Sequence, residues 1–357
     1  MQLNFCLISL LISFSLCNLI VPITIKIGKR FQLEDQPGPR RQHKSALVRI
    51  GGLAIGSSFI LTLGILALFS RFNEFESLLK QINLEILAPF ILITLSFFLL
   101  GFAEDIFVLN PFFRLVSQAA IATIAWAEGF HIQNILITSN GPLITMPWAL
   151  SWLITVLWIV GVTNAFNWLD GLDGLAIGIA AITTIVLSIY CIINQQHLTL
   201  LICIIQFGAY LGFLIHNFFP AKILMGDSGS YYIGSSISLL TLLSINQSSN
   251  GFSLGDILIY LPLLILFLPL CDMVIVITKR IIKGHSPFFP DRTHIHHRIL
   301  LNGVSHKNSV LSIYFLNLIP LILSLLIYLN DLIKLIFIIP ILLLFLKLFL
   351  LKTHKNI

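Results

Sequence analysis

The sequence is dominated by apolar runs that are long enough to cross a lipid bilayer. Eleven such runs can be marked, at about 4–25, 51–70, 86–103, 114–130, 149–166, 174–193, 198–216, 231–246, 257–279, 309–329 and 332–351. A helix of roughly 20 apolar residues spans a hydrocarbon core of about 30 Å, whereas a transmembrane β-strand needs only about ten. We therefore expect an all-α, polytopic integral membrane protein with about 11 transmembrane helices.

Composition excludes the soluble alternatives. Hydrophobic residues make up 57% of the 357 residues and charged residues only 10%, against about 25% charged residues in a soluble domain. So few charges cannot cover a surface in water, which rules out a cytosolic enzyme, a secreted disulfide scaffold and a disordered chain. The net charge of +6 has to be interpreted by position along the chain, and we expect no nucleic-acid partner.

The basic residues indicate the orientation in the membrane. If the N-terminus lies outside, eleven spans place segments 26–50, 103–113, 164–173, 217–230 and 279–308 and the C-terminal tail on one side. These segments and the adjoining span ends hold eighteen of the 21 Lys and Arg residues, so this side is predicted to be cytoplasmic. No basic residue precedes the first run, and we expect an uncleaved span there. Residues 1–357 are predicted to form one membrane-embedded domain.

The unusual polar residues collect in four of the cytoplasmic segments. They are Glu104-Asp105, Asn164 to Gly174, Met225 to Gly229, and Asp291 to Arg298. The second segment contains no Lys or Arg, and acids gathered without a counter-charge repel one another unless a cation lies between them. Carboxylate and amide oxygens suit a hard ion such as Mg²⁺. Helix capping or loop closure explains any one segment as well, but explains less readily why all four share one face.

Three histidines, His294, His296 and His297, invite comparison with a zinc site. No cysteine accompanies them, and their spacing differs from that of the usual helical ligand pairs. They lie beside Arg292 and Arg298, which favours a role as donors to phosphate oxygens. The basic residues of loop 26–50 have a simpler explanation as topology signals that attract anionic lipid.

Acids with Mg²⁺ on one side and Arg and His on the other suit phosphoryl transfer, because they would clamp a pyrophosphate and neutralise its charge. The sequence lacks the G-x-x-x-x-G-K-[ST] loop of common ATP-binding proteins. With eleven spans and no large soluble part, one substrate is expected to be a lipid.

At this point the motifs resemble those of the polyprenyl-phosphate N-acetylhexosamine-1-phosphate transferases, the glycosyltransferase 4 type. The resemblance covers about Asp35 to Arg298 in five ordered blocks. They are Asp35-x-Pro37-x-x-Arg40-Arg41-x-His43 with Arg49-Ile-Gly-Gly52; Gly101-Phe-Ala-Glu104-Asp105; Asn164-Ala-Phe-Asn167-Trp-Leu-Asp170-Gly-Leu-Asp173-Gly; Phe219-Pro-Ala-Lys222-Ile-Leu-Met-Gly226-Asp227-Ser-Gly229; and Pro287-Phe-Phe-Pro-Asp291-Arg-Thr-His294-Ile-His296-His297-Arg298. The N-outside topology with eleven spans is the one expected of the family's N-acetylglucosaminyl branch.

The resemblance implies that a UDP-N-acetylamino sugar gives its sugar-1-phosphate to undecaprenyl phosphate and releases UMP. It implies Mg²⁺, with Mn²⁺ as an alternative ion, held by Asn167 and Asp227. Catalytic positions are matched by Glu104, Asp105, Asp170, Asp173, His294, His296 and His297. Substrate-binding positions are assigned to His43, Arg49, Lys222, Asp291, Arg292 and Arg298. The implied location is the bacterial inner membrane with the site on its cytoplasmic face, and a homodimer is an open alternative.

Two departures from the family pattern refine this expectation. Glu104 stands where the family usually has Asp, which moves the carboxylate out by one methylene. Val108 stands where the phospho-N-acetylmuramoyl-pentapeptide branch typically has Lys, so the chain is expected to belong to the branch that starts O-antigen or other cell-envelope polysaccharides, including lipopolysaccharide. GlcNAc is the default sugar, and its 6-deoxy relatives stay open.

We favour direct attack by the lipid phosphate, which is mostly a dianion at pH 7, over a two-step route through Asp105. Two rival functions are a CDP-alcohol phosphotransferase and a lipid or ion transporter. Asp170-Gly and Asp173-Gly suggest the phosphotransferase, but this chain lacks the residues that continue the motif in that family. A transporter would need acids near the bilayer midplane. Asp272, inside the ninth run, is the one acid of that kind, and it is expected to line a cavity or to mark a helix break.

Overall fold

The computed structural model describes residues 3–36, 45–69, 83–132, 134–135, 144–246, 260–287 and 293–329. Its helices are α1 (Leu3–Arg30), α2 (Gly52–Phe69), α4 (Leu84–Phe107), α5 (Pro111–Ala127), α6 (Trp148–Leu169), α7 (Leu175–Ile193), α8 (His197–Asn217), α9 (Gly226–Asn246), α11 (Tyr260–Ile265), α12 (Phe267–Ile282), α13 (Ile295–Leu301) and α14 (His306–Leu329). Two short antiparallel pairs complete it: β1 (Glu34–Asp35) with β2 (Leu47–Val48), and β3 (Asn134–Ile135) with β4 (Ile144–Thr145).

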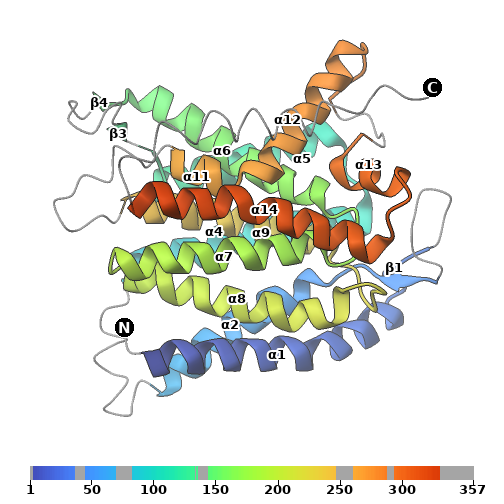
Figure 1. The fold of residues 1–357 in the computed structure, drawn as a ribbon. Helices are drawn as coiled ribbons and strands as arrows, with labels where there is room; N and C mark the ends of the chain where they lie inside the picture. The colour runs from blue at the N-terminus through green and yellow to red at the C-terminus, as the bar shows by residue number, and fades with distance from the viewer. Residues whose placement is uncertain are drawn as a thin grey trace.

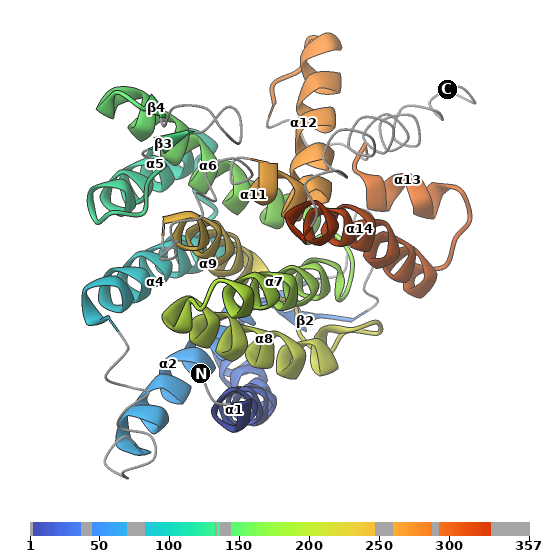
Figure 2. The ribbon, with the colours of Figure 1, turned by 60° about the vertical axis from the view of Figure 1, so that its left-hand side comes forward.

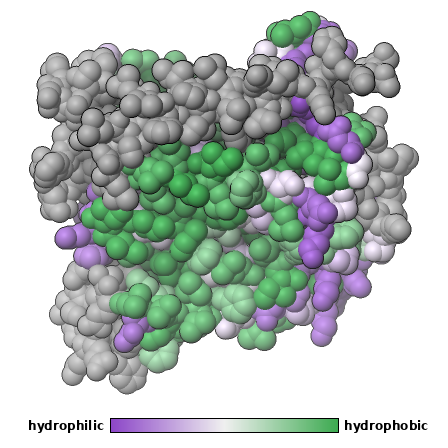
Figure 3. All heavy atoms as spheres, in the orientation of Figure 1, coloured by the Kyte–Doolittle hydropathy of each residue, from purple (hydrophilic) through white to green (hydrophobic). Residues whose placement is uncertain are grey.

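The described helices confirm an all-α, multi-pass membrane protein. Seven of them are long and apolar enough to cross a bilayer: α1, α2, α4, α6, α7, α8 and α14. The long helices lie roughly parallel, and β1 and α13 lie at the end opposite the N-terminus (Figure 1). Seen from the side shown in Figure 1, a broad hydrophobic surface covers the middle of the bundle (Figure 3). Many hydrophilic residues gather towards the end with β1 and α13.

The other expected spans differ from simple apolar helices. The fourth corresponds to α5, which is 17 residues long. The ninth is divided at Leu266 into the short α11 and the longer α12. The eleventh, 332–351, lies outside the described residues. α12 projects away from the bundle, whereas α9 runs through its middle (Figure 2).

Helix α9 is the central element, packed against α2, α4, α6 and α7. It is rich in serine, yet it can be buried because its hydroxyl groups bond within the helix. Ser235, Ser238 and Ser244 each donate to the carbonyl oxygen three residues earlier. These internal bonds satisfy polar groups that hydrocarbon could not, and they explain why the eighth run looked weak as a span.

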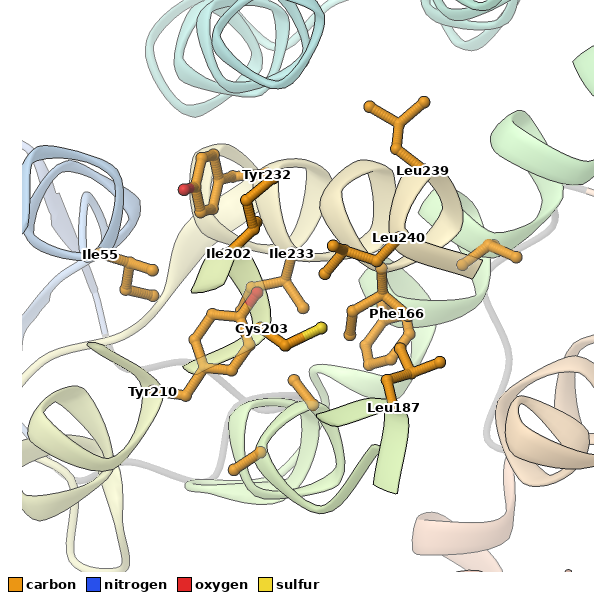
Figure 4. Packing of buried hydrophobic residues seen from close by; sticks show 14 of the residues in the cluster. Ile55, Phe166, Leu187, Ile202, Cys203, Tyr210, Tyr232, Ile233, Leu239 and Leu240 are labelled. Carbon is orange, nitrogen blue, oxygen red and sulfur yellow. The ribbon is translucent and has the colours of Figure 1, made fainter. Parts of the chain in front are cut away.

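Apolar side chains of the surrounding helices pack against α9. Ile233 and Leu240 of α9 lie towards Phe166 of α6, Leu187 of α7 and Tyr210 of α8 (Figure 4). All five are buried. The apolar core holds the central helix in place, so that its first turn is fixed against the ends of the helices around it.

Candidate active site

The last turn of α4 meets the first turn of α9. The Asp105 carboxylate accepts the backbone N–H of Asp227 on Oδ1 at 2.9 Å and the backbone N–H of Ser228 on Oδ2 at 3.0 Å. Free N–H groups at a helix N-terminus favour an anion, and a carboxylate supplies one. The approach is close at Gly101, where an added Cβ would lie 2.3 Å from the carbonyl oxygen of Asp227. Only glycine allows the two helices to approach this closely there.

Arg49 connects Asp105 to Asp227. Its Nε donates to Asp105 Oδ1 at 3.1 Å and its Nη2 to Asp227 Oδ2 at 3.1 Å. The segment before α2 holds Arg49 in place because its backbone pairs with the segment before α9: Leu224 N–H donates to Val48 at 2.8 Å, and Gly51 N–H donates to Leu224 at 3.1 Å. Residues far apart in the sequence thus form one charged cluster.

Asn167 adds an amide to this cluster from the last turn of α6. Its Nδ2 donates to Asp227 Oδ1 and, at 3.0 Å, to Ser230 Oγ. An amide carries an oxygen beside its NH₂ group, so Asn167 and Asp227 together offer the oxygen donors that a hard cation takes. Within the described residues, no three His, Cys, Asp or Glu side chains form a complete metal site. The two residues fit Mg²⁺ if substrate oxygens complete its shell.

The turn between α6 and α7 brings two more acids to the cluster. Asp173 Oδ2 accepts the backbone N–H of Ala221 at 3.0 Å. Asp170 is half-buried, and its carboxylate has no hydrogen bond within the described part of the chain. Burial, followed by the charges of Asp227, Asp173 and Asp105, raises the pKa of Asp170 to about 8. The carboxyl groups gathered here outnumber the one positive charge of Arg49, so a bound cation would favour their ionised forms.

Glu104 faces a different way from its neighbour Asp105. Its Oε1 accepts from Arg114 Nη1 at 3.0 Å and its Oε2 accepts the backbone N–H of Leu109 at 2.7 Å. The side chain is 9% exposed. Glu104 thus closes the turn between α4 and α5, and its contacts lie apart from those of Arg49 and Asp227. The extra methylene of Glu is what lets one side chain span both groups.

The histidines approach the acids at the turn after α6. The His296 ring lies against Gly171, where an added Cβ would come within 2.2 Å of its Nε2. The ring centroids of His294 and His297 lie 5.5 and 4.3 Å from that of His296. Burial, followed by the nearby histidines, lowers the pKa of His296 well below its ordinary value. The ring is therefore neutral at pH 7 and carries a single N–H.

Sequence reasoning missed a partner of these histidines. Asp272, on α12, accepts from His294 Nδ1 at 2.7 Å. The only signal in the sequence was an acid within an apolar run, because Asp272 and His294 are 22 residues apart. His306, at the start of α14, was also missed; its ring stacks on Phe219 with centroids 4.4 Å apart.

Two further expected site residues, Lys222 and Arg298, have no hydrogen bond or ion pair with the cluster among the described residues. Lys222 is exposed, and no described acid pairs with it. Arg298 lies on α13, where its backbone N–H bonds to His294 O at 3.1 Å. His43, Asp291 and Arg292 lie outside the described residues. Their assignment to substrate binding stays a prediction.

Comparison with known proteins identifies the family of this chain. The pattern of the family described as Glycosyl transferase family 4 matches residues 86–245. A Bacillus subtilis protein named as a probable undecaprenyl-phosphate N-acetylglucosaminyl 1-phosphate transferase is 34% identical over 315 residues, which cover 87% of this chain and 82% of that protein. A decaprenyl-phosphate N-acetylglucosaminephosphotransferase of Mycobacterium leprae is 30% identical over 304 residues, 81% of this chain and 75% of the relative. An undecaprenyl-phosphate alpha-N-acetylglucosaminyl 1-phosphate transferase of Escherichia coli O157:H7 is 26% identical over 293 residues, 80% of this chain and 73% of the relative.

Proposed function

Since the chain belongs to glycosyl transferase family 4, in its polyprenyl-phosphate N-acetylglucosaminyl-1-phosphate transferase branch, we propose that it transfers a sugar-1-phosphate from a UDP-N-acetylamino sugar to undecaprenyl phosphate. UMP is the second product. The observation that carries this proposal is the cluster of Arg49, Asp105, Asn167 and Asp227 at the ends of four segments. Its arginine can donate hydrogen bonds to a diphosphate, and its carboxylate and amide oxygens can bind the metal ion that accompanies the diphosphate.

Asn167 and Asp227 are the residues that would hold Mg²⁺, with Mn²⁺ as an alternative. When bound, the ion would neutralise negative charge on the diphosphate and on the leaving UMP. Burial, and then repulsion from the neighbouring acids, raises the pKa of Asp170. A cation would relieve that repulsion, which supports this assignment. Arg49 keeps two carboxylates in fixed positions and offers the opposite charge to an incoming phosphate.

In the proposed reaction, an oxygen of the lipid phosphate attacks the β-phosphorus of the UDP-sugar. A new P–O bond forms there, the bond between that phosphorus and the bridging oxygen breaks, and UMP leaves with the electron pair. The lipid phosphate is mostly a dianion at pH 7, so a strong base is unnecessary. Asp105 already accepts two backbone N–H groups and pairs with Arg49, which makes it a poor nucleophile and supports the one-step route.

We propose that His296 and His297 of the histidine motif contact the nucleotide sugar and its phosphates. The same role is proposed for His43, Lys222, Asp291, Arg292 and Arg298. The closeness of His296 to the turn after α6 supports this placement for the motif. Eleven spans, an external N-terminus and a catalytic face in the cytoplasm complete the proposal, with segments 26–50, 103–113, 164–173, 217–230 and 279–308 as catalytic loops. The product is proposed to start O-antigen or another cell-envelope polysaccharide in the inner membrane; a homodimer is left open.

A panel of UDP-sugars tests this function directly. Purified protein is incubated with undecaprenyl phosphate, Mg²⁺ and UDP-GlcNAc or its 6-deoxy analogues, and UMP release is followed. We expect one donor to support turnover and Asp227→Ala to abolish Mg²⁺-dependent transfer while membrane insertion is retained. Full activity of Asp227→Ala would remove this residue from the site, and turnover with CDP-alcohols in place of UDP-sugars would replace the proposed reaction.

A further inference from the structure

A single carboxylate joins helix α12 to the start of α13. Asp272 Oδ2 accepts from His294 Nδ1 at 2.7 Å, and Asp272 Oδ1 accepts the backbone N–H of Ile295 at 2.8 Å. Asp272 is 3% exposed and His294 is 7% exposed. Both oxygens are therefore used inside the protein, on the side chain and on the backbone of the same short segment. An acid within an apolar helix has found two donors, as its burial demands.

Arg280 occupies the other side of the His294 ring. Its Nη2 lies 3.5 Å from His294 Nε2, and its Nη1 donates to the carbonyl oxygen of Pro287 at 2.5 Å. Its guanidinium also lies over the Trp168 ring, 5.1 Å from the centroid. Arginine only donates hydrogen bonds, so this contact favours an unprotonated His294 Nε2, but at 3.5 Å it is too long to fix the tautomer by itself. A ring with a single proton would then carry it on Nδ1, facing Asp272.

This arrangement separates His294 from the two histidines that follow it. Both ring nitrogens of His294 are engaged within the protein, which leaves neither free to donate to a phosphate. His296 and His297 are carried by α13, and the His296 ring lies against Gly171 beside Asp170. The position of these two rings relative to the acids depends on how the start of α13 is held.

We propose that Asp272 is a positioning residue that fixes the Nδ1–H tautomer of His294 and anchors α13, so that His296 and His297 are presented to the acidic cluster. A carboxylate that holds a histidine in one tautomer is a recurring device for orienting a reacting or ligating group. Asp272 acts from a helix that otherwise projects away from the bundle (Figure 2). The α12–α13 segment is thereby tied to the end of α6 through Arg280 and Trp168.

The tautomer can be measured without any assay of activity. We would label the histidines with ¹⁵N and compare the unmodified protein with His294→Gln, which assigns the His294 signals by their loss. The expected spectrum has a protonated Nδ1 and an unprotonated Nε2 for His294. In Asp272→Asn the amide can present an NH₂ group to Nδ1, and the proton is expected to move to Nε2. A protonated Nε2 in the unmodified protein overturns the proposal.

A kinetic measurement, which rests on the proposed function, tests the consequence for the site. Asp272→Asn is expected to raise KM for the UDP-sugar about 10- to 100-fold and to leave KM for undecaprenyl phosphate unchanged. Thr278→Val is the matched control, because Thr278 is exposed on the same helix. Among the described residues, its hydroxyl donates only to Val274 O within that helix. Equal KM values for Asp272→Asn and Thr278→Val overturn the proposal. If no UDP-sugar is a substrate, the proposed function fails and the tautomer measurement still decides the role of Asp272.

Discussion

Asp105 on α4 accepts the backbone N–H of Asp227 on α9 at 2.9 Å, so an acid at the end of one helix caps the beginning of another. The same carboxylate pairs with Arg49, which in turn pairs with Asp227. The two acids therefore share a cation and a helix terminus. The geometry of the site depends on this junction, and changes on either side of it should disturb both.

Replacing Asp105 with Asn tests the junction itself. The amide has one oxygen instead of two and no charge, so one backbone N–H and part of the Arg49 pairing are lost. We expect transferase activity to fall about 100-fold or more, together with a lower Tm. Glu85→Gln, an exposed acid in the first turn of the same helix, is the control. An activity of Asp105→Asn equal to that of the control would show that the carboxylate is dispensable.

The close approach of α4 and α9 gives a second prediction. An alanine at Gly101 would place Cβ 2.3 Å from the carbonyl oxygen of Asp227, so the helices have to separate. We expect Gly101→Ala to insert into the membrane and to lose most of its activity. Gly64→Ala on α2 is the matched control, because no atom of the described residues lies within 4 Å of its added Cβ. If the two variants are equally active, the site tolerates a wider spacing than the structure implies.

Asp170 predicts how stability changes with pH in metal-free protein. Its pKa is raised from an ordinary 3.8 to about 8, chiefly by burial and then by Asp227. The native state holds this proton more tightly than the unfolded state does. The stabilisation is therefore fully present below about pH 4 and is lost as pH rises through about 8. Asp170→Asn should remove this loss.

The measurement is Tm from pH 5 to pH 8.5 in detergent without divalent ions. We expect the Tm of Asp170→Asn to exceed that of the unmodified protein by an amount that grows with pH. Glu128→Gln, an exposed acid after α5, should follow the unmodified protein at every pH. Parallel curves for Asp170→Asn and the unmodified protein would contradict the raised pKa.

Glu104 predicts an effect on stability that follows side-chain length. Asp in its place is too short to reach both Leu109 N–H and Arg114, whereas Gln keeps the reach and loses the charge. We expect Tm to fall in the order unmodified protein, Glu104→Gln, Glu104→Asp, with each lost charged hydrogen bond contributing about 1.5–3 kcal/mol. Glu85→Asp controls for shortening an exposed acid of the same helix. A Glu104→Asp protein with unchanged Tm and turnover would show that the longer acid has no special use.

The distribution of Lys and Arg predicted that four segments lie on one side of the membrane. The structure brings together one residue from each of them: Arg49, Asp105, Asn167 and Asp227. The sequence was less informative about where helices end. Asn167 and Asp227, expected in loops, lie on the last turn of α6 and the first turn of α9. Hydropathy marks where apolar residues stop, and a helix continues past that point when its polar end is still hydrogen-bonded.

Glu104 and Asp105 are adjacent in the sequence, yet their side chains point to different partners. Successive residues on an α-helix point about 100° apart, so the two acids of the pair cannot face the same partner. This could have been inferred from the sequence once α4 was predicted to extend through them. The partnership of Asp272 with His294 could not, because it depends on how the projecting helix α12 and the segment after it are placed.

The most direct test follows the β-phosphorus of the donor. The UDP-sugar that the donor panel selects is labelled with ³²P at the β-phosphate and mixed with purified protein, Mg²⁺ and undecaprenyl phosphate. We predict that the label moves into the lipid phase, that unlabelled UMP appears in equal amount, and that no UMP is released when the lipid is left out. Label retained in UDP, or released as inorganic phosphate, would contradict transfer of a sugar-1-phosphate.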